Sequence, residues 1–238
     1  MVRKKIEKKK KSFQTAARKL VTGLLSKSIV SEQFRTLRTN INFSMPDKEL
    51  KTLLFTSSSP GEGKSTVAAN MAVVFSQEGK RVLLVDADMR KPTVHHTFHI
   101  TNTEGISDLL SRKSILEDVV KTCEIDNLSI ITCGPIPPNP AELLSSQTMQ
   151  KLLEEMTDKY DLIIFDAPPV LSVTDAQILS NKCEGTVLIL NSGNTEKNAL
   201  LKAKEALNSS KANILGVVLN NFKLQKNHYY YQYYGNVE

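Results

Sequence analysis

Short apolar runs alternate with longer segments of helical periodicity over most of the chain. The apolar runs lie at residues 52–56, 82–85, 128–132, 162–165, 186–190 and 214–219. Continuous apolar runs of this length are typical of strands that are buried on both faces of a parallel sheet. The segments 31–43, 64–78, 141–158 and 195–209 are predicted to be helices, and Asn139 with Pro140 marks a helix start. This alternation predicts an α/β fold with a mainly parallel sheet flanked by helices.

The two ends of the chain differ from this central part. Residues 1–11 contain seven Lys or Arg and one Glu, which accounts for the whole net charge of +6. The rest is neutral, so no nucleic-acid partner is predicted. Residues 13–25 follow with a helical apolar stripe, which could rest on an anionic membrane or a partner, or belong to a flexible extension. We expect a basic extension over 1–27, one domain over 28–226 and a flexible tail over 227–238.

No apolar run approaches the roughly 18 residues of a membrane span, and no signal peptide is evident. The three cysteines, at positions 123, 133 and 183, show no disulfide or metal spacing. An odd number of scattered cysteines is typical of a reducing compartment, so a cytoplasmic location is predicted.

A glycine-rich segment joins the first apolar run to the helix that follows it. In this order of strand, turn and helix, backbone N–H groups close on phosphate oxygens, while the helix N-terminus and Lys64 add positive charge. Ser65 is placed to bind Mg²⁺. The strict pattern requires glycine at position 58, where this chain has Ser58. The residues expected to hold the nucleotide are Ser59, Pro60, Gly61, Glu62, Gly63, Lys64, Ser65 and Thr66.

Acidic residues follow two further predicted strands. Asp86 and Asp88 come after residues 82–85, and Asp166 comes after 162–165. Ligands bind beyond the carboxyl ends of parallel strands, so these residues and the glycine-rich segment could meet at one Mg²⁺–ATP site. Asp166 has the place of a metal-holding Walker B carboxylate. Because Mg²⁺ needs fewer carboxylates than this, one of the pair could accept a proton from an attacking hydroxyl.

The last ten residues contain five of the six tyrosines of the chain. Tyrosine rings at an extreme terminus could form a strip that docks on a partner, or they could be chemical targets. A phenol, with a pKa near 10, is a nucleophile that gains from a neighbouring base. The five tyrosines are Tyr229, Tyr230, Tyr231, Tyr233 and Tyr234.

Taken together, these segments resemble the bacterial tyrosine kinases, a P-loop family unlike the eukaryotic kinases. The likeness is greatest to the cytosolic kinases of Gram-positive capsule and exopolysaccharide operons, and it spans about residues 28–238. It implies a P-loop NTPase fold of the MinD and ParA kind and an ATP- and Mg²⁺-dependent protein-tyrosine kinase. Such a kinase autophosphorylates its tail tyrosines in trans and regulates polysaccharide synthesis. The matching segments are 31–40, 58–66, 83–90, 134–144, 163–169 and the tyrosine cluster.

The resemblance also implies roles for single residues. Lys64, Asp86 and Asp88 would be catalytic, while Ser65, Asp88 and Asp166 would hold the metal. Asn220 would contact adenine. Glu32, Arg35 and Arg38 match an oligomerisation motif, although their three-residue spacing also fits a local ion pair.

The implied partners are a ring of identical subunits, a membrane-anchored activator that recruits the kinase to the inner face of the membrane, protein tyrosine substrates and a phosphotyrosine phosphatase.

Two other classes of protein compete with this interpretation. One is a MinD- or ParA-like switch ATPase, which usually carries a lysine where this chain has Ser59 and lacks a terminal tyrosine run. The other is a scaffold that binds ATP without catalysis.

Overall fold

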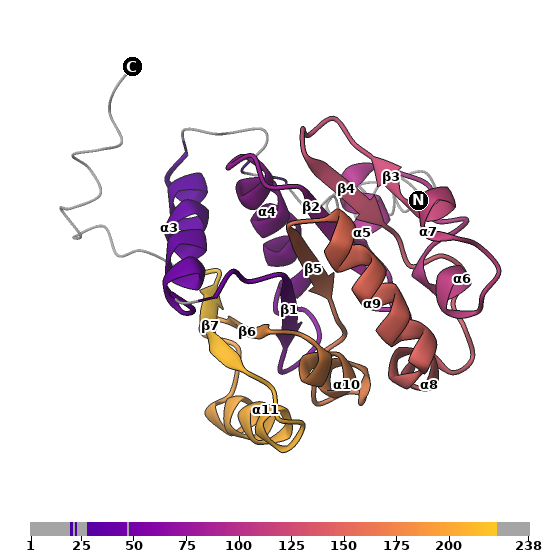
Figure 1. Cartoon of the computed structure of the whole chain (residues 1–238). Helices are drawn as coiled ribbons and strands as arrows, with labels where there is room; N and C mark the ends of the chain where they lie inside the picture. The colour runs from indigo at the N-terminus through magenta and orange to yellow at the C-terminus, as the bar shows by residue number, and fades with distance from the viewer. Residues whose placement is uncertain (1–19, 21, 23–27, 47, 223–238) are drawn as a thin grey trace, which may run out of the picture.

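A single sheet with helices on both faces forms the protein in the computed structural model, which describes residues 20, 22, 28–46 and 48–222 (Figure 1). In this part of the chain seven strands lie in the order β3-β4-β2-β5-β1-β6-β7. All neighbouring strands are parallel except β3 and β4. The strands are β1 (Thr52–Ser57), β2 (Val82–Asp86), β3 (Lys121–Thr122), β4 (Leu128–Ile131), β5 (Leu162–Asp166), β6 (Gly185–Asn191) and β7 (Ile214–Asn220).

Helices of one group cover one face of the sheet. The group consists of α3 (Ile29–Phe43), α4 (Lys64–Ser76) and α5 (Val94–Phe98). Leu53 and Phe55 of β1 point to this face and pack in one apolar cluster with Val67 and Phe75 of α4. Twelve of the 13 residues of α4 are buried, so α4 is the central helix of this layer.

The second face is covered by a larger set of helices. Leu54 of β1 points to this side and packs in a separate cluster with Leu153, Leu179 and Leu207. The alternation of Leu53, Leu54 and Phe55 between two clusters follows from the two-residue period of a strand. The helices are α6 (Ile106–Leu110), α7 (Leu116–Val119), α8 (Pro140–Ser145), α9 (Gln147–Lys159), α10 (Asp175–Lys182) and α11 (Lys197–Ser209).

The six predicted strands and the predicted α/β architecture are confirmed. The prediction of one helix over 141–158 is wrong, because the chain breaks at Ser146 into α8 and α9. Ser146 has extended backbone, and its side chain accepts a hydrogen bond from the N–H of Met149, which caps α9. The apolar pattern continues through the break because both helices pack on the same cluster, so the pattern alone does not reveal it.

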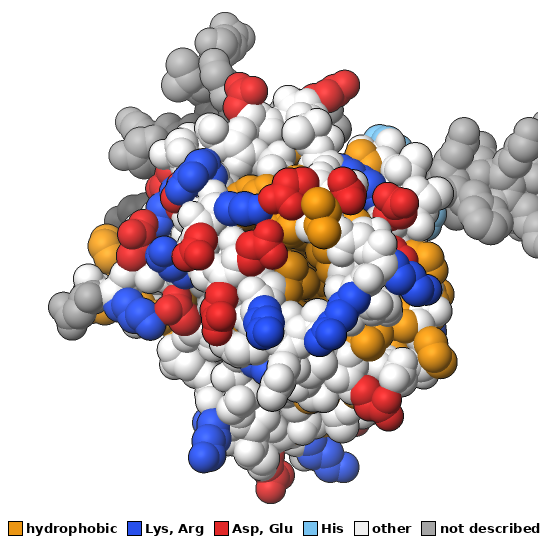
Figure 2. Space-filling view, turned by 45° about the vertical axis from the view of Figure 1, so that its right-hand side comes forward, with side chains coloured by type: hydrophobic (Ala, Val, Ile, Leu, Met, Phe, Trp, Pro, Cys, Tyr) orange, Lys and Arg blue, Asp and Glu red, His pale blue; other side chains and the backbone are white. Residues whose placement is uncertain are grey.

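The basic residues 1–11 and the tyrosine tail lie outside the described residues, as does most of the segment 13–25. Of the described residues there, Thr22 is buried, and its N–H and hydroxyl both donate to Asn70 Oδ1 of α4. No helix in the described ranges is long and apolar enough to cross a membrane. On the face in Figure 2, Lys and Arg side chains alternate with Asp and Glu, with apolar side chains between them, so this face shows no patch of one sign.

Candidate active site

The glycine-rich segment forms a tight loop between β1 and α4. Gly61 has a φ of 84° and Gly63 a φ of 92°, both in the left-handed region that residues with a Cβ rarely adopt. Gly63 directly precedes the first residue of α4. The loop therefore has the glycine-dependent backbone that a phosphate cradle requires, and it leads directly into the N-terminus of α4.

The side chain of Glu62 stabilises this loop through hydrogen bonds. Glu62 is 5% exposed. The Ser58 hydroxyl donates to both its carboxylate oxygens at 2.9 Å, and the Ser59 N–H donates to Oε2 at 2.8 Å. The Thr195 hydroxyl, which follows β6, donates to Oε1. Ser58 thus departs from the strict glycine pattern because its hydroxyl holds Glu62.

Asn220 lies beside the same loop, at the end of β7. Its Nδ2 donates to the Glu62 carbonyl oxygen at 3.0 Å, and a Cβ on Gly63 would come within 2.0 Å of that nitrogen. Asn220 therefore closes the loop on the β7 side. Its contact with adenine stays a prediction.

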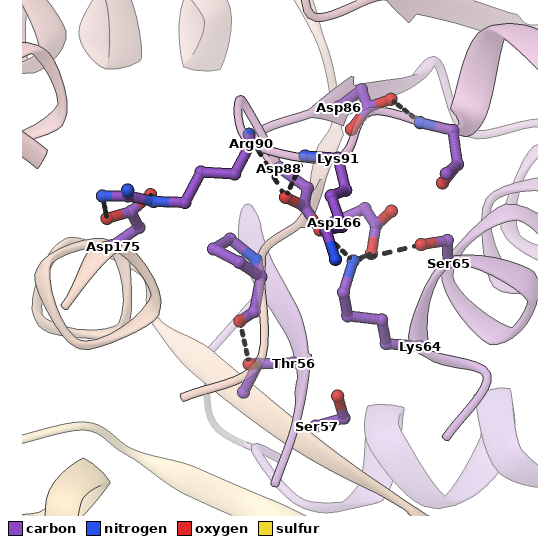
Figure 3. A network of polar contacts seen from close by, with 12 residues as sticks. Thr56, Ser57, Lys64, Ser65, Asp86, Asp88, Arg90, Lys91, Asp166 and Asp175 are labelled. Carbon is purple, nitrogen blue, oxygen red and sulfur yellow. Dashed lines mark hydrogen bonds and ion pairs between the residues drawn. The ribbon is translucent and has the colours of Figure 1, made fainter. Parts of the chain in front are cut away.

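Lys64 connects the three strand ends that the sequence predicted to converge (Figure 3). Its Nζ lies 2.9 Å from Asp88 Oδ2 and 3.1 Å from Asp166 Oδ1, and it donates to the Ser65 hydroxyl at 3.1 Å. Burial alone lowers the pKa of Lys64, but the charges of Asp166 and Asp88 outweigh it, so the pKa is raised. Lys64 is therefore a permanent cation at the carboxyl ends of β1, β2 and β5.

Asp86 lies deeper than Asp88. Its Oδ2 accepts hydrogen bonds from the N–H groups of Thr93 and Val94 at 2.8 and 2.9 Å, and these hold the start of α5. Burial, followed by the charge of Asp166, raises its pKa to about 7. The two acidic residues of the motif thus differ, because Asp88 lines the adjacent cleft and Asp86 is enclosed behind it.

The donor set fits a magnesium ion. In the described part of the chain, Asp86 Oδ1 and Asp166 Oδ2 are buried and have no hydrogen-bond partner. The described residues contain no group of three or more His, Cys, Asp or Glu side chains that could hold a metal ion, so the protein would supply two carboxylates and a hydroxyl. Mg²⁺ usually takes one or two carboxylates and completes its shell with water and substrate phosphates, so Ser65, Asp88 and Asp166 suit it.

A cleft of about 540 Å³ opens in front of these groups. The phosphate loop and Ser65 line it, together with Asp88 and Arg90 from the segment after β2. Pro168, Pro169 and Val173, which follow β5, give it an apolar side. The cleft therefore offers both a charged end and a wall against which an aromatic ring could pack.

The predicted oligomerisation residues all lie on α3, and none of them lines this cleft. Glu32 and Arg35 form an ion pair within the helix. Arg38 donates to the Val74 carbonyl oxygen of α4 and pairs at 2.8 Å with Glu78, which follows the end of α4. Arg38 therefore fastens α3 to α4 within one subunit, which the sequence interpretation did not foresee.

The sequence did not predict two interactions at the site. One is the contact of Glu62 with Thr195, and the other is a bidentate pair between Arg90 and Asp175. Arg90 belongs to the acidic motif that carried the resemblance, but Asp175 and Thr195 stand in no motif, and only their positions after β5 and β6 bring them here.

Several known proteins are similar to this chain in sequence. Residues 50–195 match a family model described as an AAA domain. The chain is 54% identical over 209 residues to the tyrosine-protein kinase YwqD of Bacillus subtilis, covering 88% of each chain. It is 41% identical to the putative tyrosine-protein kinase CapB of Staphylococcus aureus, covering 88% of this chain and 92% of the relative.

Solved structures give the same result. The chimerical protein CapA2B2 has a TM-score of 0.84 and 43% identity, covering 86% of this chain and 90% of that chain. MinD of Pyrococcus furiosus has a TM-score of 0.62 at 24% identity over 74% of each chain, which shows the shared fold alone.

Fold and phosphate cradle together define a P-loop nucleotide-binding protein. Within that class, the chain belongs to the bacterial tyrosine kinases and is a tyrosine-protein kinase. The resemblance inferred from the sequence is confirmed, and the kinase interpretation is favoured over the switch ATPase.

We expect the ionisation of Asp86 to lower the stability of the nucleotide-free protein as pH rises from about 4 to 7. The folded-state pKa of about 7 lies above the ordinary value of 3.8, so in this window the folded state binds more protons than the unfolded state. Stability falls with pH wherever that is so. Asp86→Asn keeps an oxygen acceptor for Thr93 and Val94 but does not titrate. Urea unfolding at several pH values should show a flatter profile for the variant, and parallel profiles would contradict the raised pKa.

Proposed function

We propose that this kinase transfers the γ-phosphoryl group of Mg²⁺–ATP to the tyrosines of its own C-terminal tail. The observation that carries the proposal is the convergence of Lys64, Asp88 and Asp166 at a cleft with an apolar side. A chain that belongs to the tyrosine kinases and has five tyrosines in its last ten residues contains its own acceptors.

The residues of the site divide the work of the transfer between phosphate binding, metal binding and proton acceptance, and Asp88 takes part in the last two. The loop N–H groups and Lys64 bind the phosphate oxygens, and Ser65, Asp88 and Asp166 would hold the magnesium ion, which supplies charge neutralisation when bound. The Asp86–Asp88 pair accepts the proton of the tyrosine hydroxyl as the phenol oxygen bonds to phosphorus, and ADP leaves. Asp88 is the member of the pair that lines the cleft.

The test is to incubate the purified chain with Mg²⁺–ATP labelled at the γ-phosphate. We expect label on tyrosine, at the tail. Label that appears only as free phosphate would support a switch ATPase instead, and ATP binding without turnover would support a scaffold.

The remaining features of the resemblance complete the proposal. The kinase acts in the synthesis of a capsular or extracellular polysaccharide, because the relatives include tyrosine-protein kinases named for cps regions. A membrane-anchored activator would bring it to the inner face of the membrane, and a phosphotyrosine phosphatase would reverse the reaction. Co-purification of the kinase with the membrane fraction only in the presence of a partner would test the recruitment.

Helix α3 is the proposed contact between subunits of a ring. It combines Glu32 and Arg35 with apolar side chains that remain exposed, Ile29 at 45% and Phe43 at 75%. Exposed apolar surface beside charged residues is typical of a protein interface. Transfer in trans would then deliver the tail of one subunit to the cleft of the next.

Replacing Arg35 and Arg38 with alanine should dissociate the ring. We expect Arg35→Ala alone to lower the mass measured by light scattering at nearly unchanged monomer stability. Arg38→Ala should lower both mass and stability, because it also loses Glu78 and the Val74 carbonyl. Lys159→Ala, which removes exposed pairs with Glu117 and Glu155, is the control. An unchanged mass in the double variant would leave Glu32 and Arg35 as a local ion pair.

A further inference from the structure

A buried carboxylate holds an arginine at the mouth of the cleft. Asp175 is the first residue of α10, and its side chain is fully buried. Arg90 follows β2, and its side chain is 40% exposed. The Arg90 Nε donates to Asp175 Oδ2 at 2.9 Å, and its Nη2 donates to Oδ1 at 3.0 Å. Figure 3 shows Arg90 leaving the chain beside Asp88 and reaching across to Asp175.

A second bidentate Arg–Asp pair in the same molecule shows that the burial of Asp175 is unusual. Arg81 and Asp161 also form a bidentate pair, with distances of 3.2 and 2.7 Å, just before β2 and β5. That pair lies at the amino ends of the same two strands, and its side chains are 60% and 34% exposed. A solvated pair of this kind contributes little to stability. Of these two bidentate pairs, Arg90–Asp175 is the one whose carboxylate is fully out of water.

Burying a carboxylate costs free energy that an ion pair only partly returns. A side chain that merely joined two loops could do so in solvent, as Arg81 does. The bidentate contact fixes the plane of the Arg90 guanidinium. A function that requires one orientation of Arg90 would explain the free-energy cost of burying the Asp175 carboxylate.

The pair leaves most of the guanidinium available. Arginine has five N–H donors, and the contact with Asp175 uses one at Nε and one at Nη2. The others, including both at Nη1, belong to a side chain that lines the cleft together with Lys64, Ser65 and Asp88. Arg90 therefore lines the same cleft as the phosphate-binding groups, with its guanidinium held at the Asp175 side of that cleft (Figure 3).

We propose that Asp175 is a positioning residue that fixes Arg90 so that its remaining N–H groups contact the phosphoryl group during transfer. The inference rests on the proposed function. Phosphoryl transfer spreads negative charge over the equatorial oxygens, and an arginine held in place stabilises that charge without reorganising. Arg90 acts on the transition state, and Asp175 acts only through Arg90.

The test compares Arg90→Gln, Arg90→Lys and Asp175→Asn in the full chain, with Asp161→Asn as the matched control. We expect Arg90→Gln to lower kcat for tyrosine phosphorylation about 100-fold, as loss of one transition-state donor does. Arg90→Lys should not restore it, because a point charge lacks the planar fork. Asp175→Asn should lower kcat about tenfold, and Asp161→Asn should change it by less than about twofold.

Three readouts separate positioning from a structural role. The affinity of Arg90→Gln for a fluorescent ATP analogue should remain near that of the unchanged chain. Its melting temperature should fall, because Asp175 is left buried without a counter-ion, and adding Asp175→Asn should restore part of the melting temperature but not kcat. The double variant Arg90→Gln with Asp175→Asn should be no slower than Arg90→Gln alone, because the two residues act as one unit.

Normal kcat in Arg90→Gln would overturn the inference, as would losses that multiply in the double variant. If Asp175→Asn does not fold, the two Arg90 variants decide the matter. If the unchanged chain forms no phosphotyrosine, the proposed function fails. The same comparison is then made on ATP hydrolysis, where Arg90 would contact the same phosphoryl group and a normal rate in Arg90→Gln would still overturn the inference.

Discussion

Lys64→Met is expected to abolish both ATP binding and autophosphorylation. The Lys64 ammonium lies 2.9 Å from Asp88 and 3.1 Å from Asp166, in a position that is 9% exposed. Methionine keeps the length of the side chain but leaves these carboxylates without a counter-ion, and breaking such a buried pair costs about 3–5 kcal/mol. Anionic phosphates would then meet uncompensated negative charge. We expect the affinity for ATP to fall at least about 100-fold.

Titration with a fluorescent ATP analogue and an antibody against phosphotyrosine measure the two properties. Lys80→Met is the matched control, because Lys80 forms a long surface pair with Glu49 at 3.7 Å. That variant should bind ATP normally. Phosphotyrosine at the normal level in Lys64→Met would show that the phosphate loop is not the site of transfer.

Replacing all five tail tyrosines with phenylalanine is expected to remove most phosphotyrosine while ATP hydrolysis remains measurable. Phenylalanine retains the aromatic ring and its packing surface but lacks the hydroxyl that attacks phosphorus. The change therefore separates a tail that is phosphorylated from a tail that only docks on a partner. The cleft residues Lys64 and Asp88, and Asp166 behind them, are untouched, so water can still take the phosphoryl group.

The sixth tyrosine supplies the control. Tyr160 follows α9, and its ring packs against the apolar core. Tyr160→Phe should leave phosphotyrosine unchanged, and mass spectrometry should locate phosphate on residues 229–234. Phosphate found mainly on Tyr160 would contradict the proposal that the tail is the acceptor.

The sequence by itself determined the class of fold and the phosphate cradle. Six of the seven strands could be located because each is a continuous apolar run, and buried parallel strands need no polar face. Gly61, Gly63 and Lys64 stand within one contiguous motif, so their local chemistry can be read without knowing what surrounds them. The meeting of Asp88 and Asp166 with Lys64 also followed from the sequence, because parallel strands present their carboxyl ends at one edge.

Other features depended on the tertiary structure. The hydrophobic pattern did not reveal β3, because this strand has only two residues. It did not reveal the break at Ser146, because α8 and α9 bury their apolar residues in one cluster. Asp86 and Asp88 look alike in the motif, but Asp86 is buried more deeply than Asp88, and this difference in burial gives them different roles. In the sequence Arg38 belongs to a predicted oligomerisation motif, whereas in the structure it donates to the Val74 carbonyl of α4 and pairs with Glu78 just beyond that helix.

The contacts that complete the site are the least predictable from sequence. Glu62 and Thr195 are 133 residues apart, and Arg90 and Asp175 are 85 residues apart. Neither Thr195 nor Asp175 belongs to a recognisable motif. They reach the phosphate loop and the cleft because the sheet places β6 beside β1 and β5 beside β2. A motif specifies which groups bind phosphate, but the order of the strands decides which distant side chains hold those groups in place.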